Sequence, residues 1–314
     1  MILCVGLTPT VQRTQWFTSL TPGAVNRARE TRVTASGKGI NVARVLTTLG
    51  GSAKLVQILG GRSGHYLAET LDAEGVPHHS VWAEDDAPTR TCLTILPDDG
   101  PATELVEEAP PVSPHDVSLL AAACKTALLE ARAVCCSGSL PAGAPETFYA
   151  DLVREGRSLG IPVVVDGQKG PLREALREKP FLVKPNREEA AATLNLTVSG
   201  DAEADARAAV RALTEAGAEW ALVSMGKAGS LLGNGAELWR IVSPTVNAVN
   251  PIGSGDSLAA GFLYAHFEQS FTVPDAVVFG TACAAANCLT ATSGVLRPDD
   301  VQQLISQVQL EKWG

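Results

Sequence analysis

Short apolar segments alternate with segments of helical periodicity along most of the chain, and this alternation restricts the fold more than any other feature. The predicted strands are residues 2–7, 54–59, 133–136, 162–166, 181–184, 220–224, 238–242 and 245–249. The predicted helices are residues 40–49, 66–74, 119–130, 146–159, 172–177, 188–194, 204–216, 257–267 and 276–289. Such alternation is typical of a parallel sheet, and right-handed crossovers place helices on both of its faces. We therefore expect an α/β fold with a doubly wound, mostly parallel central sheet.

Two segments, 14–34 and 89–106, break the alternation. Polar and apolar residues alternate in both, and both contain Pro and Gly, which predicts antiparallel strands with one exposed face. The two segments can pair into a small accessory sheet. Because no long linker or repeat divides the chain, we expect one domain over residues 1–314, with lid segments at about 12–34 and 88–107.

Composition and charge exclude several classes of partner. The chain has 314 residues, of which 45% are hydrophobic, and its net charge is −9 without any basic block. This negative charge argues against nucleic acid as a binding partner, because its phosphates bind a basic face of a protein. The apolar stretch 276–289 is too short and interrupted to span a bilayer, and the N-terminus lacks the basic region of a signal peptide. The seven cysteines lie mostly in apolar runs without a CxxC pair, so we expect buried, reduced thiols and a cytoplasmic location without a membrane partner.

The sharpest local motif is Gly253-Ser254-Gly255-Asp256, between a predicted strand and a predicted helix. Small residues at such a turn let backbone amides approach an anion, and the helix N-terminus adds positive potential. Asp256 falls in the first helical turn, where we expect a lowered pKa. The alternative is a structural one, because Asp is also a favoured helix cap. The standard phosphate motifs GxxxxGK[ST] and GxGxxG are absent.

Three cationic residues lie in segments that can face the same turn. Lys38 stands between glycines before a helix, where the helix dipole disfavours a cation unless an anion is nearby. Arg27 and Arg90 lie in the two lid segments and can reach a phosphate if both segments close over one cleft. Each also has a simpler explanation as a solvated surface charge.

Two further motifs follow predicted strands, at the sheet edge where open α/β sheets bind ligands. The first is Lys-Pro-Asn-Arg-Glu-Glu at 184–189, in which Asn186 and Glu189 can also form a simple capping box. The second is Ser-Met-Gly-Lys-Ala-Gly at 224–229, which is also compatible with a tight turn.

The order and spacing of five motifs resemble the ribokinase/PfkB family of carbohydrate kinases. They are Gly-Lys-Gly-Ile-Asn-Val-Ala-Arg at 37–44, Ser-Gly-Ser-Leu-Pro at 137–141, Lys-Pro-Asn-Arg-Glu-Glu at 184–189, Val-Ser-Met-Gly-Lys-Ala-Gly at 223–229 and Gly-Ser-Gly-Asp-Ser at 253–257. The resemblance runs from residue 1 to about residue 300. Pro-Gly-x-Val-Asn-Arg at 22–27 is most similar to 1-phosphofructokinases and tagatose-6-phosphate kinases. The resemblance implies a ribokinase-like three-layer α/β/α sandwich with a small β-sheet lid.

The resemblance also implies an activity. Members transfer the γ-phosphoryl group of ATP to a sugar hydroxyl, here of a phosphorylated ketose, with fructose 1-phosphate as the first candidate and fructose 1,6-bisphosphate as its product. The alternatives are tagatose 6-phosphate or fructose 6-phosphate as acceptor, or a non-catalytic sugar-phosphate or nucleotide sensor on the same scaffold. ATP and Mg²⁺ are the implied cofactors, and the need for a monovalent cation stays open. The implied assembly is a homodimer formed through the lid.

Roles for individual residues follow from the same resemblance. Asp256 is the expected catalytic base, and the amides of Gly253, Ser254 and Gly255 form the anion hole for the migrating phosphoryl group. The expected nucleotide-site residues are Lys184, Asn186, Ser224, Gly226, Lys227, Gly229 and Asn287, with Glu189 organising the metal indirectly through water. The expected acceptor-site residues are Gln12, Arg27, Lys38, Gly39, Asn41 and Arg90.

Three departures from the family pattern concern the acceptor. Gln12 replaces an Asp that holds sugar hydroxyls, and it supplies no charge. Ser36 replaces the first Gly of the usual pair, so its side chain occupies space beside the substrate. Asp-Gly-Gln-Lys at 166–169 stands where many relatives have Asp-x-Ser-Gly. These departures put the identity of the sugar in doubt and leave the transfer machinery intact.

Overall fold

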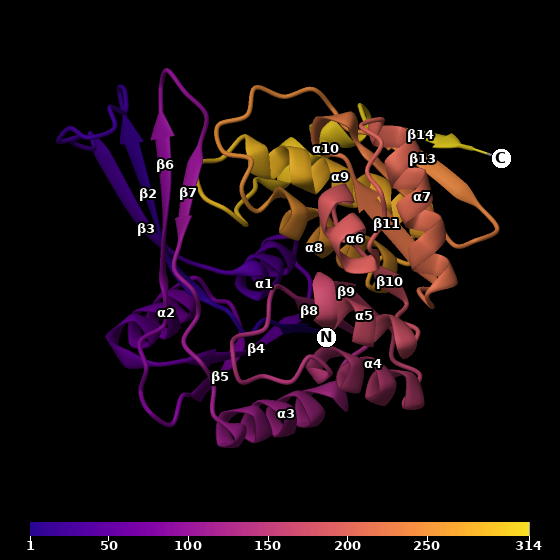
Figure 1. The fold of residues 1–314 in the computed structure, drawn as a ribbon, viewed down its shortest axis with the longest axis horizontal. Helices are drawn as coiled ribbons and strands as arrows, with labels where there is room; N and C mark the ends of the chain where they lie inside the picture. The colour runs from indigo at the N-terminus through magenta and orange to yellow at the C-terminus, as the bar shows by residue number, and fades with distance from the viewer. Residues whose placement is uncertain (314) are drawn as a thin grey trace.

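The structure, a computed structural model, describes residues 1–313 as a large sheet between two layers of helices, with a second, small sheet standing at one end (Figure 1). The large sheet has the strand order β14-β13-β12-β11-β10-β9-β8-β1-β4-β5. Its strands are β1 (Ile2–Val5), β4 (Ala53–Leu59), β5 (His78–Trp82), β8 (Ala133–Ser137), β9 (Val163–Asp166), β10 (Leu182–Val183), β11 (Trp220–Ser224), β12 (Ser230–Gly233), β13 (Leu238–Val242) and β14 (Gln309–Lys312). Neighbouring strands from β5 to β11 are parallel, and the last three pairings are antiparallel. The predicted α/β class with a mostly parallel sheet is therefore confirmed.

Helices cover both faces of this sheet, as the crossover rule predicts. One layer contains α1 (Lys38–Thr48), α2 (Gly61–Ala73), α8 (Ser254–Phe267), α9 (Val273–Cys288) and α10 (Pro298–Ile305). The other contains α3 (Pro114–Leu128), α4 (Phe148–Ser158), α5 (Lys169–Arg177), α6 (Arg187–Leu194) and α7 (Ala202–Glu215).

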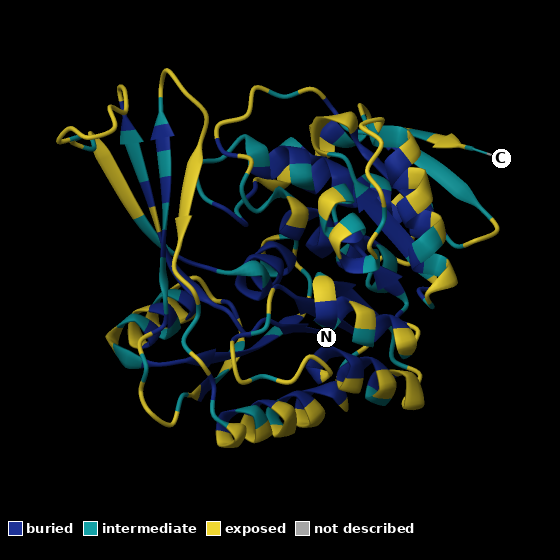
Figure 2. Ribbon diagram, in the orientation of Figure 1, coloured by how far each residue is buried: buried dark blue, intermediate teal, exposed yellow. Residues whose placement is uncertain are grey.

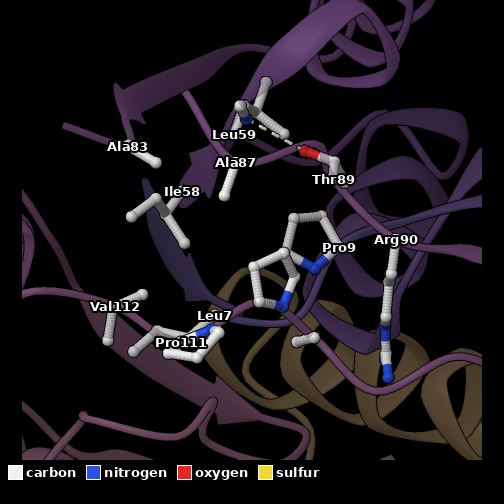
Figure 3. Close-up of a pocket in the computed structure, with 13 residues that line it drawn as sticks. Leu7, Pro9, Ile58, Leu59, Ala83, Ala87, Thr89, Arg90, Pro111 and Val112 are labelled. Atoms are coloured by element: carbon white, nitrogen blue, oxygen red, sulfur yellow. Dashed lines mark hydrogen bonds between the residues drawn. The ribbon is translucent and has the colours of Figure 1, made fainter. Parts of the chain in front are cut away.

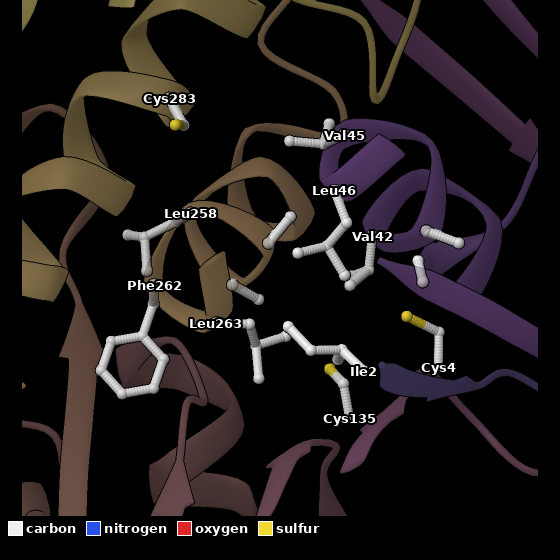
Figure 4. Close-up of a cluster of buried hydrophobic side chains, with 14 of the residues drawn as sticks. Ile2, Cys4, Val42, Val45, Leu46, Cys135, Leu258, Phe262, Leu263 and Cys283 are labelled. Atoms are coloured by element: carbon white, nitrogen blue, oxygen red, sulfur yellow. The ribbon is translucent and has the colours of Figure 1, made fainter. Parts of the chain in front are cut away.

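The central strands β1, β8, β9 and β10 are apolar up to the polar residues that close β8 and β9, because both of their faces are buried (Figure 2). In β1, Ile2 and Cys4 face the α1/α8/α9 layer, whereas Leu3 and Val5 face the opposite layer. Figure 4 shows the first core, in which Ile2 and Cys4 meet side chains of α1 and α8. This packing fixes the beginnings of α1 and α8 against the same sheet edge.

The small sheet, hereafter the lid, consists of four strands in the order β3-β2-β6-β7. They are β2 (Thr10–Phe17), β3 (Glu30–Ser36), β6 (Thr91–Pro97) and β7 (Thr103–Val106). Each lid segment forms one antiparallel hairpin, as predicted, but the two hairpins join through a parallel pairing of β2 with β6. The lid therefore leaves two free edges, at β3 and at β7.

One predicted strand is wrong. Residues 245–249 are not a strand, although their side chains alternate, because the segment lies along the end of α9. There the backbone nitrogens of Val249 and Asn250 donate to the carbonyl oxygen of Cys288 at 2.7 and 3.3 Å.

The structure also bears on the cysteines and on membrane-spanning helices. Six of the seven cysteines are buried, and the seventh, Cys288, is half-buried, all as free thiols. The neighbours Cys135 and Cys136 point to opposite faces of the sheet. Among residues 1–313, no helix combines the length and apolar character that crossing a membrane requires.

Candidate active site

The Gly-Ser-Gly-Asp motif forms the beginning of α8. Gly253 is the residue before the helix and has φ of 82°, a conformation that favours glycine. A Cβ atom on Gly253 would lie 2.7 Å from the backbone nitrogen of Gly294, so the turn packs closely on the loop after α9. The amides of a first helical turn have no intrahelical partners and point outward from the helix end. The Ser254 nitrogen donates to the Pro251 carbonyl oxygen at 3.2 Å, so the first-turn amide that can bind an anion is that of Gly255.

Asp256, in the first turn of α8, is only 6% exposed. Burial raises the pKa of its carboxyl to about 6, while nearby Lys38 and a hydrogen bond from Asn41 oppose the rise. In that hydrogen bond, Asn41 Nδ2 donates to Asp256 Oδ2 at 2.7 Å. The expected lowering of this pKa is wrong because removal from water outweighs the helix dipole. Asp256 thus carries a pKa close to that of a general base used near neutral pH.

Two lysines meet on Asp166, the last residue of β9. Lys38 Nζ donates to Asp166 Oδ1 at 3.1 Å, and Lys184 Nζ lies 3.2 Å from Asp166 Oδ2. Burial would raise the pKa of Asp166, but Lys184 and Lys38 hold it below its usual range. Burial would likewise lower the pKa of Lys38, but the carboxylates of Asp166, Asp256 and Glu189 raise it. Lys38 is therefore held in its cationic form in the free protein.

Lys184 also borders the α8 turn, because its Nζ lies 3.4 Å from where a Cβ on Gly255 would be. Lys38 shares a carboxylate with Lys184, so the two cations lie together beside the anion hole. From the sequence, Lys38 is expected at the acceptor, and Asp166 is not among the expected site residues. The available signal for Asp166 was an acidic residue closing the apolar strand 163–166 at its carboxyl end.

A cavity of about 360 Å³, hereafter the β11–α8 cavity, opens on the other side of the same turn. Its walls come from the β11–β12 connection, the segment 243–251, the beginning of α8 and the inner face of α9. The lining residues include Ser224, Gly226, Lys227, Gly229, Thr245, Pro251, Ser254, Gly255, Leu258 and Cys288. Four residues predicted for the nucleotide thus share a cavity with the anion hole.

Asn287 does not line this cavity. Its side chain is fully buried, and its Oδ1 accepts from Ser257 Oγ at 3.1 Å and from the Gly294 nitrogen at 2.8 Å. Its Nδ2 donates to the Ile252 carbonyl oxygen at 2.9 Å. These contacts give Asn287 a structural role under the α8 turn, and its expected place in the nucleotide site stays a prediction.

Asn186 and Glu189 form a capping box at the beginning of α6. Asn186 Oδ1 accepts from the Glu189 nitrogen at 2.8 Å, and Glu189 Oε2 accepts from the Asn186 nitrogen at 2.9 Å. Within residues 1–313 no cluster of three metal-ligating side chains exists. This donor set fits a Mg²⁺ ion that takes most of its ligands from nucleotide phosphates and water, as Mg²⁺ commonly does, with Glu189 beside it.

On the lid side, Gln12 is 5% exposed, and its Nε2 donates to Thr94 Oγ1 at 2.8 Å. Gln12 therefore offers its Oε1 as a neutral acceptor. Gly39 lies where α1 crosses β1, and a Cβ atom there would approach Gly6 Cα to 2.9 Å. This contact accounts for the glycine at position 39.

Arg90 lies at the base of the lid, where its guanidinium donates to the carbonyl oxygens of Thr8 and Glu107, both at 3.1 Å. Figure 3 shows it beside Pro9, at the border of an apolar pocket of about 30 Å³, which is room for one water molecule. No carboxylate of the described chain forms an ion pair with Arg90; its charge acts on Glu104, where it opposes the rise in pKa that burial causes. Arg27 is exposed in the β2–β3 loop, and no ion pair within residues 1–313 includes it.

Comparison with known proteins agrees with this geometry. The family model described as pfkB family carbohydrate kinase matches residues 1–299. Phosphofructokinase-2 from Escherichia coli, solved in complex with potassium, is 27% identical over 98% of both chains, with a TM-score of 0.87. The same enzyme has been solved with fructose-6-phosphate, with substrates and products, and as a tetrameric inhibited form.

Two more distant structures share the fold. A possible 1-phosphofructokinase from Thermotoga maritima has a TM-score of 0.89 at 23% identity, over 100% of this chain and 99% of its own. The ribokinase of Arabidopsis thaliana, complexed with ribose and ATP, has a TM-score of 0.74 at 20% identity, over 97% of this chain and 98% of its own. The ribokinase-like fold is thereby confirmed. With the family model spanning all but the last residues, the chain belongs to the pfkB family of carbohydrate kinases and is an ATP-dependent phosphotransferase.

Proposed function

We propose that this kinase transfers the γ-phosphoryl group of ATP to a hydroxyl of a phosphorylated ketose, with fructose 1-phosphate as the first candidate. The observation that carries the proposal is the position of Asp256. It lies in the first turn of α8, where Lys38 and Lys184 act on its charge and Asn41 donates to it, and the preceding residue, Gly255, lines the β11–α8 cavity.

Phosphoryl transfer passes through a loose transition state, so positioning and charge neutralisation supply most of the catalysis. We assign the neutralisation to Lys38, Lys184 and the amides of the α8 turn. Lys38 thus serves the migrating group rather than the acceptor's own phosphate. Asp256 orients the acceptor hydroxyl and takes its proton as the new O–P bond forms.

ATP would occupy the β11–α8 cavity, with its base against the apolar wall and its phosphates toward Gly255. Lys227 and the small residues Ser224, Gly226 and Gly229 would allow close approach of the nucleotide. Mg²⁺ bound to the phosphates would neutralise developing charge, with Asn186 and Glu189 near its water shell.

The acceptor would lie under the lid. Arg90 is the cation best placed for its phosphate, because neutral carbonyl groups fix the guanidinium and no carboxylate of the described chain forms an ion pair with it. Arg27 would have to reach this site from an exposed loop. Asn41 and the Gln12 Oε1 atom are the candidate contacts for sugar hydroxyls.

A panel of acceptors tests the assignment. ADP release would be measured with fructose 1-phosphate, fructose 6-phosphate, tagatose 6-phosphate and unphosphorylated fructose, for the parent and for Gln12→Asp. We expect the highest kcat/KM with a ketose phosphate and a changed preference in Gln12→Asp. ATP binding without release on any acceptor would favour a sensor, and an unchanged preference would refute the role given to position 12.

We further propose that two copies associate through the lid. Strand β7 is exposed along its whole length, including Leu105 at 53% and Val106 at 55%, and an uncovered strand edge readily pairs with another chain. Sedimentation of Leu105→Lys beside the parent tests this, because a surface charge there should favour the monomer. A parent that is monomeric at assay concentrations would refute it.

A further inference from the structure

Asn41, on the first turn of α1, has an amide whose orientation is fixed by its neighbours. Asn41 Oδ1 accepts from Ser36 Oγ at 3.2 Å and, at 3.4 Å, from Arg44 Nη1. Because both donors face the oxygen, the Nδ2 atom is the one that faces Asp256. Asn41 is 4% exposed, so water does not compete strongly for these contacts.

Each of the two donors is itself held by buried contacts. Arg44 is 5% exposed, and its Nη2 donates to the Ala35 carbonyl oxygen at 2.7 Å while its Nε donates to Glu74 Oε2 at 2.8 Å. Ser36 Oγ shares a 3.0 Å hydrogen bond with Ser293 Oγ. The network thus joins the last residue of lid strand β3, helix α1, the end of α2 and the loop after α9.

We propose that Ser36 and Arg44 are positioning residues for Asp256, and that they act through the amide of Asn41. The donated hydrogen bond holds Asp256 Oδ2 and leaves Oδ1 for the acceptor hydroxyl. If the amide turned over, its oxygen would face the carboxylate, which disfavours the ionised form. Ser36 and Arg44 prevent that turn, and thereby keep Asp256 ionised and correctly oriented. The proposal rests on the assignment of Asp256 as the base.

The other charged groups around Asp256 come from different elements. Lys38 on α1 and Lys184 after β10 favour its ionised form, whereas Asp166 on β9 disfavours it. None of the three contacts Ser36 in the described hydrogen-bond network. A substitution of Ser36 therefore changes the donor to Asp256 without removing any of these charges.

The pH dependence of kcat/KM tests the proposal, because its acid limb reports the pKa of the essential base in the free enzyme. In Ser36→Ala and Arg44→Lys we expect this limb to move to higher pH by roughly half a unit to one unit. Activity on the acid side then falls about 3- to 10-fold, since each pKa unit corresponds to tenfold in ionisation. The variants should approach the parent at alkaline pH.

Ser80→Ala is the matched control, since Ser80 lies on β5 and its hydroxyl accepts from Gln57 Nε2 at 3.2 Å. Its profile should equal that of the parent. An equal loss for Ser36→Ala at all pH values, or an unmoved acid limb, would overturn the proposal. If Arg44→Lys fails to fold, Ser36→Ala alone decides.

A double variant tests whether Ser36 acts through Asn41. In an Asn41→Ala background, Ser36→Ala should produce no further shift, because residues in one network are not additive. A full additional shift would refute the route through Asn41.

Asp256→Asn separates this inference from the proposed function. An active Asp256→Asn would remove the base assignment itself, whereas an inactive one with unmoved Ser36→Ala and Arg44→Lys profiles would remove only the positioning role.

Discussion

Asp166→Asn is the substitution whose consequence follows most directly from the structure. The carboxylate of Asp166 is 1% exposed and is the shared partner of Lys38 and Lys184. The side chain of Lys184 is 6% exposed, so its pair with Asp166 is buried, whereas 37% of the Lys38 side chain is exposed and its pair is screened by water. Breaking a buried pair costs about 3–5 kcal/mol, and a screened pair about 0–1 kcal/mol. We therefore expect Asp166→Asn to lose about 3 kcal/mol of unfolding free energy at neutral pH, nearly all of it from Lys184.

Urea unfolding of the parent and the variant measures this loss. Asp116→Asn is the matched control, because Asp116 is also buried but accepts only from the backbone nitrogens of Glu84 and Ser113. Its cost should be smaller, about 1.5–2 kcal/mol, because only hydrogen bonds from neutral N–H groups to the carboxylate are weakened. Equal losses for the two variants would refute the reasoning.

The pH dependence supplies a second check. Because the lysines lower the pKa of Asp166, its contribution is complete above its unfolded pKa of about 3.9 and is lost as the pH falls through the folded value. The difference between the parent and Asp166→Asn should therefore shrink below about pH 4. A difference that stays constant into strong acid would show that the lysines do not act on this carboxylate.

Three further outcomes are expected. Asp256→Asn should lower kcat by about 10²- to 10⁴-fold with little change in ATP affinity. In the parent, kcat/KM should fall below about pH 6, because Asp256 becomes protonated there. A parent rate that stays flat through pH 5 would contradict the base assignment. Gly253→Ala should lower thermal stability more than Gly235→Ala, since both glycines have positive φ but only Gly253 packs on a neighbouring backbone; equal losses would deny the close approach to Gly294. Asn287→Leu should lower the free energy of unfolding in urea by roughly 3 kcal/mol, because three partners under the α8 turn lose their hydrogen bonds. It should reduce kcat more than it raises the KM for ATP. A raised KM alone would place Asn287 in the nucleotide site.

The fold was predictable because its information is local. A strand such as β8 is recognised by its own apolar run, and the order of strands and helices then fixes a parallel sheet with two helical layers. The errors arise where tertiary contacts override a local pattern. Residues 245–249 alternate like a strand, yet they bind the end of α9 and line a cavity.

The site was predictable to the extent that its residues belong to contiguous motifs. The α8 turn, Lys184 and the β11–β12 connection are such motifs, and they meet in the structure at one place. The contacts of Asn41 with Asp256 and of Lys38 with Asp166 join residues 215 and 128 positions apart. No local pattern reveals these contacts, because each joins residues from different elements of the fold.

The charges at the site explain how an acidic protein with a net charge of −9 can use a polyanionic nucleotide. The carboxylates of Asp166, Asp256 and Glu189 surround Lys38, and Lys184 is the second cation among them. With Asp256 ionised, these three carboxylates and two lysines have a net charge of −1. The site therefore does not neutralise the negative phosphates of metal-free ATP. A divalent cation that accompanies the nucleotide corrects the balance without a dedicated cluster of protein ligands. Asp166→Asn removes one of the negative charges, and it should therefore bind ATP in the presence of EDTA more tightly than the parent does. Equal affinities for metal-free ATP, measured by equilibrium titration, would mean that the positions of these charges do not govern nucleotide binding.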